Sequence, residues 1–170
     1  PALVSREGVA LRHERSLMGR LLELGHPAER LAVQRRMHPE IAAFPNRRFY
    51  AGRLATEYAG VDAAVPAYRV VQVEGRCEPV GTSFANRAEA RACAELAAAL
   101  RPHFARVAVV CPYRAQAREL LAAGAPEVHT VDSFQGREAD VVVLSTTRHG
   151  TRGLGFWEDE RRLVVALTRA

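Results

Sequence analysis

Four polar clusters hold the residues of this sequence that are best suited to chemistry. Each contains arginine and lies at the end of an expected strand or on one face of an expected helix. The clusters are Gln34-Arg35-Arg36, Tyr113-Arg114-Gln116, Gln135-Gly136-Arg137-Glu138 and the pair Arg162 and Arg169. Guanidinium groups suit phosphate oxygens, a carboxylate such as Glu138 can accept from ribose hydroxyls, and Gly136 lets a backbone approach a ligand closely. The residue types therefore favour a partner that carries phosphate. Taken singly, each arginine is also compatible with solvated surface charge, and Glu138 could pair with Arg137 or cap a turn.

The charged residues of the sequence point in the same direction. There are 24 Lys and Arg residues against 19 Asp and Glu residues, which gives a formal net charge of +5. This excess favours a polyanionic partner such as nucleic acid or nucleotide phosphate. All the basic residues are arginine, so a GxxxxGK[ST] phosphate-binding loop cannot occur in this chain. If the chain handles a nucleoside triphosphate, another domain must supply the principal phosphate cradle.

Cysteine usage and hydropathy narrow the class of protein. Cys77, Cys93 and Cys111 are odd in number and form no CxxC pair, so we expect reduced thiols rather than a disulfide framework or a zinc site. No run of 18 apolar residues predicts a membrane span, and no signal peptide is recognisable. We expect one intracellular domain of 170 residues, read as a piece of a longer polypeptide because it starts at Pro1 and stops inside an expected helix.

The elements that must position these residues alternate between strand and helix, which predicts an α/β layered sheet. The apolar run at 141–145 shows no polar alternation and is typical of a buried strand in a parallel sheet. The polar loop at 131–140 leads directly into it, and polar groups beside a buried sheet are where open α/β folds bind ligands. Expected strands are residues 30–34, 68–73, 106–111, 127–131 and 141–145, and expected helices are residues 14–24, 39–44, 86–100, 112–121 and 160 onward.

Taken together, the clusters resemble the motifs of superfamily 1B helicases, in the branch of the nonsense-mediated-decay RNA helicase and senataxin. The resemblance spans roughly residues 31–170 in family order, and several matches are six to ten residues long. Residues 34–41 with 44–45 and 49–52 resemble QYRMHP…FP…FY.G, residues 111–116 resemble TPYxxQ, residues 131–138 resemble VDxFQGRE, residues 155–170 resemble GF..D.RRLNVALTRA, and residues 83–90 resemble another recurrent segment.

The resemblance implies a RecA-like P-loop NTPase fold, with a mostly parallel sheet flanked by helices, as the second motor domain of an ATP-dependent 5′-to-3′ helicase. The family continues from the last helix into a further strand, so the sheet of this chain is expected to be incomplete at its C-terminus. ATP with Mg²⁺ would lie in the cleft against the first RecA-like domain, which would hold the metal. The implied roles are Arg36 and Arg169 as arginine fingers, Arg35, Gln135, Gly136 and Glu138 on the nucleotide, and Tyr113, Gln116 and Thr130 on single-stranded RNA or DNA.

Departures from the family pattern occur at three positions, and one of them, Arg35, together with the absence of lysine leaves a second hypothesis open. Arg35 stands where the family has a tyrosine that flanks the adenine, Val164 replaces an asparagine, and Glu160 replaces a proline. An arginine can still stack on a base. Both finger arginines remain, which favours an active parent enzyme, although this chain alone is expected to be inactive. The alternative is a non-enzymatic nucleic-acid or protein-interaction module that kept the helicase fold. His38 is expected to be structural rather than a catalytic base.

Overall fold

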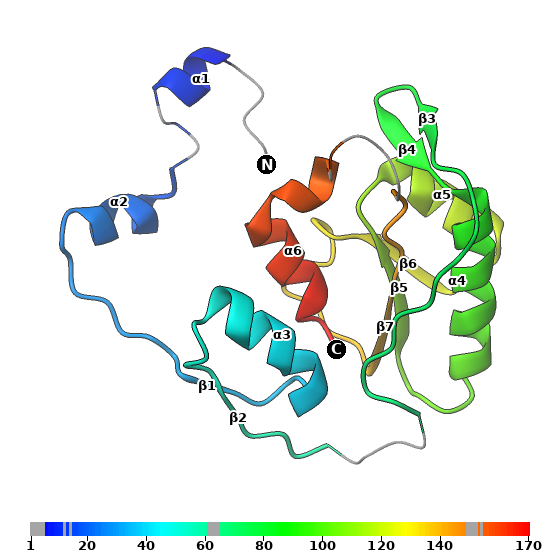
Figure 1. Cartoon of the computed structure of the whole chain (residues 1–170), viewed down its shortest axis with the longest axis horizontal. Coiled ribbons are helices and arrows are strands. Elements are labelled where there is room, and N and C mark those ends of the chain that lie inside the picture. The colour runs from blue at the N-terminus through cyan, green and yellow to red at the C-terminus, as the bar shows by residue number, and fades with distance from the viewer. Residues whose placement is uncertain (1–5, 12, 14, 61–64, 149–152, 154) are drawn as a thin grey trace. The chain divides into compact units, whose positions relative to one another are not determined.

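A computed structural model describes residues 6–11, 13, 15–60, 65–148, 153 and 155–170, and its contacts divide the chain into two units, Pro1–Ala32 and Val33–Ala170 (Figure 1). The first unit contains α1 (Arg6–Ala10) and α2 (Leu17–Glu23). Ser16 caps α2 by accepting a hydrogen bond from Gly19 N at 3.0 Å. The helix expected at 14–24 therefore forms in part. The sequence places Leu17, Leu21 and Leu24 on one face of this helix, which predicts that the face packs, but Leu17 and Leu24 are exposed, so that prediction was wrong.

The second unit is built on a parallel sheet of β5 (Val107–Cys111), β6 (Glu127–Thr130) and β7 (Val141–Leu144). The strand order is β6-β5-β7, with Cys111 opposite Thr130 and Val107 opposite Val141. Every residue of β5 is buried, as expected for a continuous apolar run at the centre of a parallel sheet. The parallel strands predicted from the apolar runs at 106–111 and 141–145 are confirmed.

Helices cover both faces of this sheet (Figure 1). Alternate residues of β5 point to opposite faces, because side chains alternate along a strand. Val107, Val109 and Cys111 join a core with α4 (Arg87–Leu100) and α5 (Arg114–Ala122). Ala108 and Val110 join a second core that contains Phe134 and reaches α6 (Glu160–Leu167). The α/β architecture with a parallel sheet flanked by helices is therefore confirmed.

Shorter elements surround the sheet. β1 (Val33–Gln34) pairs in parallel with β2 (Ala55–Thr56), and α3 (Pro39–Phe49) connects them. β3 (Glu78–Val80) and β4 (Ser83–Ala85) form an antiparallel hairpin just before α4. The short 3₁₀ helix η1 (Gly155–Glu158) precedes α6, which Asp159 caps by accepting from Arg161 N at 3.0 Å. Asp159 lies directly before the helix that the sequence predicts from residue 160 onward, and aspartate is a residue type that favours this cap position.

The strand expected at 30–34 forms only at Val33–Gln34, and two further predicted elements differ more from the structure. The helix expected to stop before Pro45 continues to Phe49, because the Asn46 side chain bonds the backbone of Leu54 at 2.8 and 2.9 Å and anchors the second half of α3. The strand expected at 68–73 does not form in the described part of the chain. Val70 is 78% exposed, and none of the described strands pairs with this segment. An apolar run needs a neighbouring strand to become one, and the run itself does not supply it.

Candidate functional site

The first site is a cluster of Arg36, Glu138 and Arg169, which we call the arginine–glutamate cluster. Arg36 Nε donates to Glu138 Oε2 at 2.6 Å, and Arg36 Nη1 donates to the Thr168 carbonyl at 3.1 Å. The backbone of Ala139 donates to the Arg169 carbonyl at 3.1 Å, which ties the residue after Glu138 to the end of α6. Residues 102 positions apart in sequence thus meet in one place.

A turn built by Gln34 presents Arg36 to this cluster. Gln34 Oε1 accepts from the backbone N of Arg36 at 3.0 Å and of Met37 at 2.7 Å. Gln34 Nε2 donates to the Met37 carbonyl and to Thr56 Oγ1, both at 2.9 Å. The turn then enters α3, where His38 Nδ1 accepts from Glu40 N at 3.2 Å as the helix cap. His38 therefore has the structural role that was predicted for it.

Arg169 lies half-buried beside Arg36. Arg169 Nε donates to the Val165 carbonyl at 2.8 Å, which fixes the side chain against the last turn of α6. Burial, followed by the positive charge of Arg36, lowers the pKa of the Arg169 guanidinium from its usual value. Arginine stays protonated in proteins, so two positive charges remain close together here. Such a pair is stabilised by an anion that both guanidinium groups can reach.

Residues 131–138, which we call the motif loop, run from one end of the sheet to the other. The loop begins after Thr130, at the carboxyl end of β6, and reaches Glu138 near the amino end of β7. Phe134 is 0% exposed and anchors the loop in the core, whereas Gln135 and Glu138 are exposed. Gly136 has φ +83°, a conformation that glycine adopts without strain. The loop is therefore anchored in the core by Val131 and Phe134, and its exposed residues extend from the carboxyl end of β6 to the amino end of β7.

The second site lies at the carboxyl end of the sheet and is formed by Phe84, Tyr113, Arg148 and Phe156, which we call the aromatic–arginine cluster. The Tyr113 ring lies 5.3 Å from the Phe84 ring and 6.0 Å from the Phe156 ring, centroid to centroid. Arg148 stacks over Phe84 at 4.6 Å, and Phe156 N donates to Tyr113 Oη at 3.4 Å. A positive charge thus lies among aromatic rings beside the end of β5.

Arg148 and Phe84 were not singled out from the sequence. Its position along the chain could have identified Arg148 as a site residue. Arg148 closely follows β7, and the carboxyl ends of parallel strands lie at the same end of the sheet. Gly155 adds to this arrangement. It has φ +58°, and a side chain at this position would collide with Arg148 and crowd Tyr113. Residues 148–155 of the sequence contain several glycines and arginines, but the sequence does not show what Gly155 approaches.

Gln116 requires a correction. It was expected to contact nucleic acid, but its side chain is 0% exposed. Gln116 Oε1 accepts from Asn86 N at 2.7 Å, and Nε2 donates to the Asn86 carbonyl at 3.2 Å and to Ser145 Oγ at 3.0 Å. The three-residue spacing between Tyr113 and Gln116 in the sequence could not show that Gln116 lies on the face of α5 that packs against the core. Gln116 instead joins α5 to α4 and to the end of β7.

The remaining predicted residues lie apart from one another. Arg35 is exposed and pairs with Glu57 at 2.6 Å, and Thr130 bonds Ser133 in the turn that begins the motif loop. Arg162 and Arg169 were expected to present two guanidinium groups on one face of the last helix. Arg162 Cζ instead lies 4.7 Å from the centre of the Phe156 ring, and Arg162 Nε lies 3.5 Å from Asp132 Oδ1. Arg162 therefore contacts the aromatic–arginine cluster and does not pair with Arg169 at the arginine–glutamate cluster.

The cysteines are expected to differ in reactivity. Burial raises the pKa of both the Cys93 and Cys111 thiols to about 12, so little thiolate exists at neutral pH. Cys77 is partly exposed, and burial raises its pKa less far. In the native protein we expect iodoacetamide to modify Cys77 first, as read by mass spectrometry at pH 8. Equal rates for all three cysteines would contradict the burial of Cys93 and Cys111, and urea-unfolded protein is the control.

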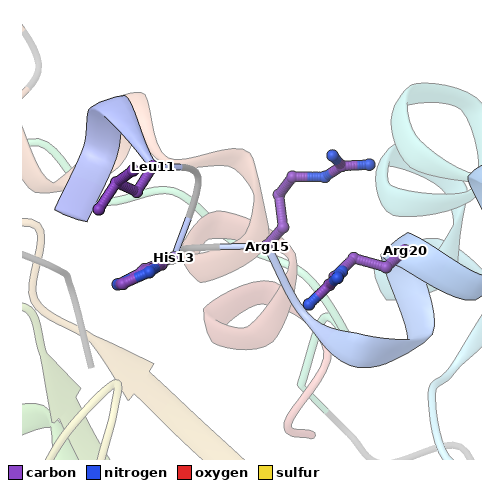
Figure 2. Close-up of a pocket in the computed structure, with 4 residues that line it drawn as sticks. All are labelled: Leu11, His13, Arg15 and Arg20. Carbon is purple, nitrogen blue, oxygen red and sulfur yellow. The ribbon is translucent and has the colours of Figure 1, made fainter.

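A surface hollow in the first unit is lined by Leu11, His13, Arg15 and Arg20, which come from the end of α1, the following turn and α2 (Figure 2). Arg15 is paired with Glu23. None of the residues predicted to bind nucleotide or nucleic acid lines this hollow.

Among the residues that the structure describes, no group of three or more His, Cys, Asp or Glu side chains could hold a metal ion. No helix in the same residues is long and apolar enough to cross a membrane.

Comparison with known proteins identifies the family of the chain. A family model described as an AAA domain matches residues 13–170. The chain is 34% identical over 198 residues to "Regulator of nonsense transcripts 1" of Dictyostelium discoideum. It is 33% identical over 202 residues to "ATP-dependent helicase upf1" and 31% identical over 198 residues to "Helicase sen1", both of Schizosaccharomyces pombe. Each alignment covers 100% of this chain but only 15%, 22% and 12% of the respective relative.

The parallel sheet with helices on both faces and the polar clusters at its two ends define a RecA-like α/β domain. The chain belongs to the AAA-domain family and is a superfamily 1 helicase domain of the nonsense-mediated-decay and senataxin type. The resemblance noted from the sequence motifs is thereby confirmed.

Proposed function

We propose that this chain is the second RecA-like motor domain of an ATP-dependent helicase or translocase that moves 5′ to 3′ on single-stranded RNA or DNA. The observation that carries the proposal is the arginine–glutamate cluster, in which Arg36 meets Glu138 at 2.6 Å beside the half-buried Arg169. Sequence motifs that lie far apart along the chain converge there on groups suited to a nucleotide. The similarity to proteins named as ATP-dependent helicases supports the same interpretation.

In this proposal the two arginines act on the terminal phosphate of ATP. The nucleotide would lie against the first RecA-like domain, which would also hold Mg²⁺, the ion that neutralises charge between the phosphates. Arg36 and Arg169 would donate to the terminal phosphate oxygens as charge shifts during transfer to water. Glu138 would accept from the ribose hydroxyls, and Gln135 and Gly136 would shape the loop beside the sugar. Arg35 would lie over the base, where its planar group can stack.

The contact between Arg36 and Glu138 must open when nucleotide binds. The two side chains are 38% and 63% exposed, so their ion pair is a surface pair. Surface pairs of this kind contribute about 0–1 kcal/mol. Breaking the ion pair therefore costs little of the free energy of nucleotide binding. Before nucleotide binds, the pair would hold Arg36 and Glu138 near the positions in which they contact it.

At the other end of the motif loop, the aromatic–arginine cluster supplies features that single-stranded nucleic acid requires. Aromatic rings stack on bases of any sequence, and arginine contacts the phosphate backbone. Tyr113 would contact a base or sugar, Arg148 a phosphate, and Thr130 the backbone near the start of the loop. Because the same loop reaches Glu138, it would link strand binding to the nucleotide.

Replacing Tyr113 with alanine is expected to weaken binding of single-stranded nucleic acid by the complete protein. Loss of one stacking residue costs about 1–3 kcal/mol, which corresponds to a roughly 5- to 150-fold weaker Kd. Fluorescence anisotropy with labelled oligonucleotides measures it. Tyr68→Ala is the matched control, because Tyr68 is exposed and lies outside the cluster.

Equal affinities for wild type and Tyr113→Ala would contradict the proposed nucleic-acid side. Binding without ATP hydrolysis by the complete protein would instead favour the alternative function, a binding module that kept the helicase fold. Oligonucleotides of RNA and of DNA are both tested, because stacking and phosphate contacts serve either one.

A further inference from the structure

Glu89 on α4 is a carboxylate in the core, and only 8% of the residue is exposed. It accepts hydrogen bonds from the backbone N of Thr147 with both oxygens at 3.0 Å, from Ser145 Oγ at 3.1 Å and from Thr146 Oγ1 at 3.4 Å. These donors follow one another directly after β7. A buried charge is tolerated when it is well hydrogen-bonded, and this one is directed at a single short segment.

A helix-capping role does not account for Glu89. Asn86 caps α4 by accepting from Glu89 N at 3.1 Å, which is one half of a capping box. In the other half, the glutamate side chain would accept from the backbone N of the cap residue. That group, Asn86 N, donates instead to Gln116 Oε1 at 2.7 Å. The carboxylate of Glu89 is thereby left to hold residues 145–147.

The segment that Glu89 holds is strained. Thr147 has φ +67°, and Arg148 N donates to the Thr146 carbonyl at 2.8 Å, which closes a three-residue turn around Thr147. A β-branched residue rarely adopts positive φ, and such turns persist where the surroundings enforce them. Among the described residues, Thr147 Oγ1 and Asn86 Nδ2 are buried without a hydrogen-bond partner. The hydrogen bonds to Glu89 therefore hold Thr147 in an unfavourable backbone conformation, although, within the described part of the chain, two buried polar atoms nearby lack a hydrogen-bond partner.

The strained turn connects to the aromatic–arginine cluster in two ways. Arg148, which follows Thr147 directly, stacks over Phe84 at 4.6 Å. The Thr146 carbonyl also accepts from Trp157 Nε1 at 3.0 Å, and Trp157 lies beside Phe156 at 5.2 Å. The position of the turn thus sets both Arg148 and the η1 segment that contacts Tyr113.

We propose that Glu89 is a positioning residue for the nucleic-acid interface, because it holds the Thr147 turn that places Arg148 against the phosphate backbone. This inference rests on the proposed function, since it assigns Arg148 to the same strand-binding side. Glu89 does not touch the nucleic acid and acts through Arg148. It gives the recurrent segment at 83–90 a role that the sequence alone did not provide.

The test measures how strongly salt weakens binding of the complete protein to a labelled 20-mer of uridylate and one of deoxythymidylate. Each phosphate contact contributes about 0.7 to the slope of log affinity against log salt concentration for single strands. Arg148→Gln is expected to reduce the slope by about this amount. Glu89→Gln is expected to reduce it equally, and the double variant no further than Arg148→Gln alone. Glu95→Gln, on an exposed position of α4, is the control and should keep the wild-type slope.

A role limited to stability would lower the melting temperature of Glu89→Gln without changing the slope, and that result would overturn the proposal. Additive slope changes in the double variant would also overturn it, since Glu89 would then act independently of Arg148. If Glu89→Gln does not fold, Glu89→Asp keeps the buried charge but shortens its reach, and a wild-type slope for that variant is the contradicting result. Failure of the wild-type protein to bind either 20-mer would overturn the proposed function itself, and this inference with it.

Discussion

Replacing Arg36 with alanine is expected to lower ATP turnover by the complete protein about 10³-fold or more, which is the scale of a lost arginine finger. Arg36 would act on charge that develops on the terminal phosphate, so its loss affects the chemical step more than nucleotide binding. The variant should fold normally, because the Arg36 side chain is exposed and its ion pair with Glu138 is a surface pair. Steady-state hydrolysis with saturating single-stranded nucleic acid measures the effect.

Two further variants make this result specific. Arg91→Ala removes an exposed arginine from the outer face of α4 and should keep wild-type turnover. Arg36→Lys keeps the charge but loses the planar fork that can hold two phosphate oxygens, so turnover should remain well below wild type. A turnover for Arg36→Ala within a few-fold of wild type would contradict the role of Arg36.

Replacing Phe134 with alanine is expected to lower the free energy of unfolding by about 3–5 kcal/mol. The Phe134 side chain is fully buried, and it packs with Val110 of β5, Val131 and Ala166 of α6. Its removal leaves a cavity where the motif loop, the sheet and α6 meet. Urea unfolding followed by circular dichroism gives the change from the midpoint and slope.

Phe44 provides the matched control for this measurement. Phe44 lies on α3, is 43% exposed and contacts Phe49 edge to face at 6.2 Å. Its replacement with alanine should cost about 1 kcal/mol or less. Equal losses for the two phenylalanines would show that Phe134 does not anchor the motif loop in the core.

The sheet could be predicted because its pattern is local. Residues 107–111 of the strand predicted at 106–111 are continuously apolar, and such a run in a chain that alternates strands with helices predicts a buried parallel strand. β5 is that strand, and all its residues are buried. The caps of α4 and α6, Asn86 and Asp159, are likewise local features, because capping depends on residue types within one turn of the helix.

Other features depend on contacts that a single sequence does not display. Pro45 fits inside α3 because Asn46 is bonded to Leu54, eight residues away. Gln116 turned out to be buried because its partners, Asn86 and Ser145, come from other elements. The exposure of the segment at 68–73 has the same origin, since a strand forms only where a neighbour pairs with it. The polar network around Glu89 was invisible for this reason as well.

The motif loop was the clearest functional feature of the sequence, and the structure gives it a definite geometry. The loop leaves the carboxyl end of β6 at Thr130 and arrives at Glu138 beside Arg36. Its buried Phe134 packs with β5 and α6 and so anchors the loop in the core. A segment of this kind is suited to linking a nucleotide at one edge of the sheet with a nucleic-acid strand at the other.

The most direct test of the motor function measures ATP hydrolysis by the complete protein with and without single-stranded RNA or DNA. We expect hydrolysis that rises when the strand is added, and loss of both the basal and the stimulated rates when Arg36 and Arg169 are replaced together by alanine. Hydrolysis by the double variant at the wild-type rate, or a wild-type rate that ignores the strand, would contradict the assignment of this chain as a nucleic-acid-dependent motor domain.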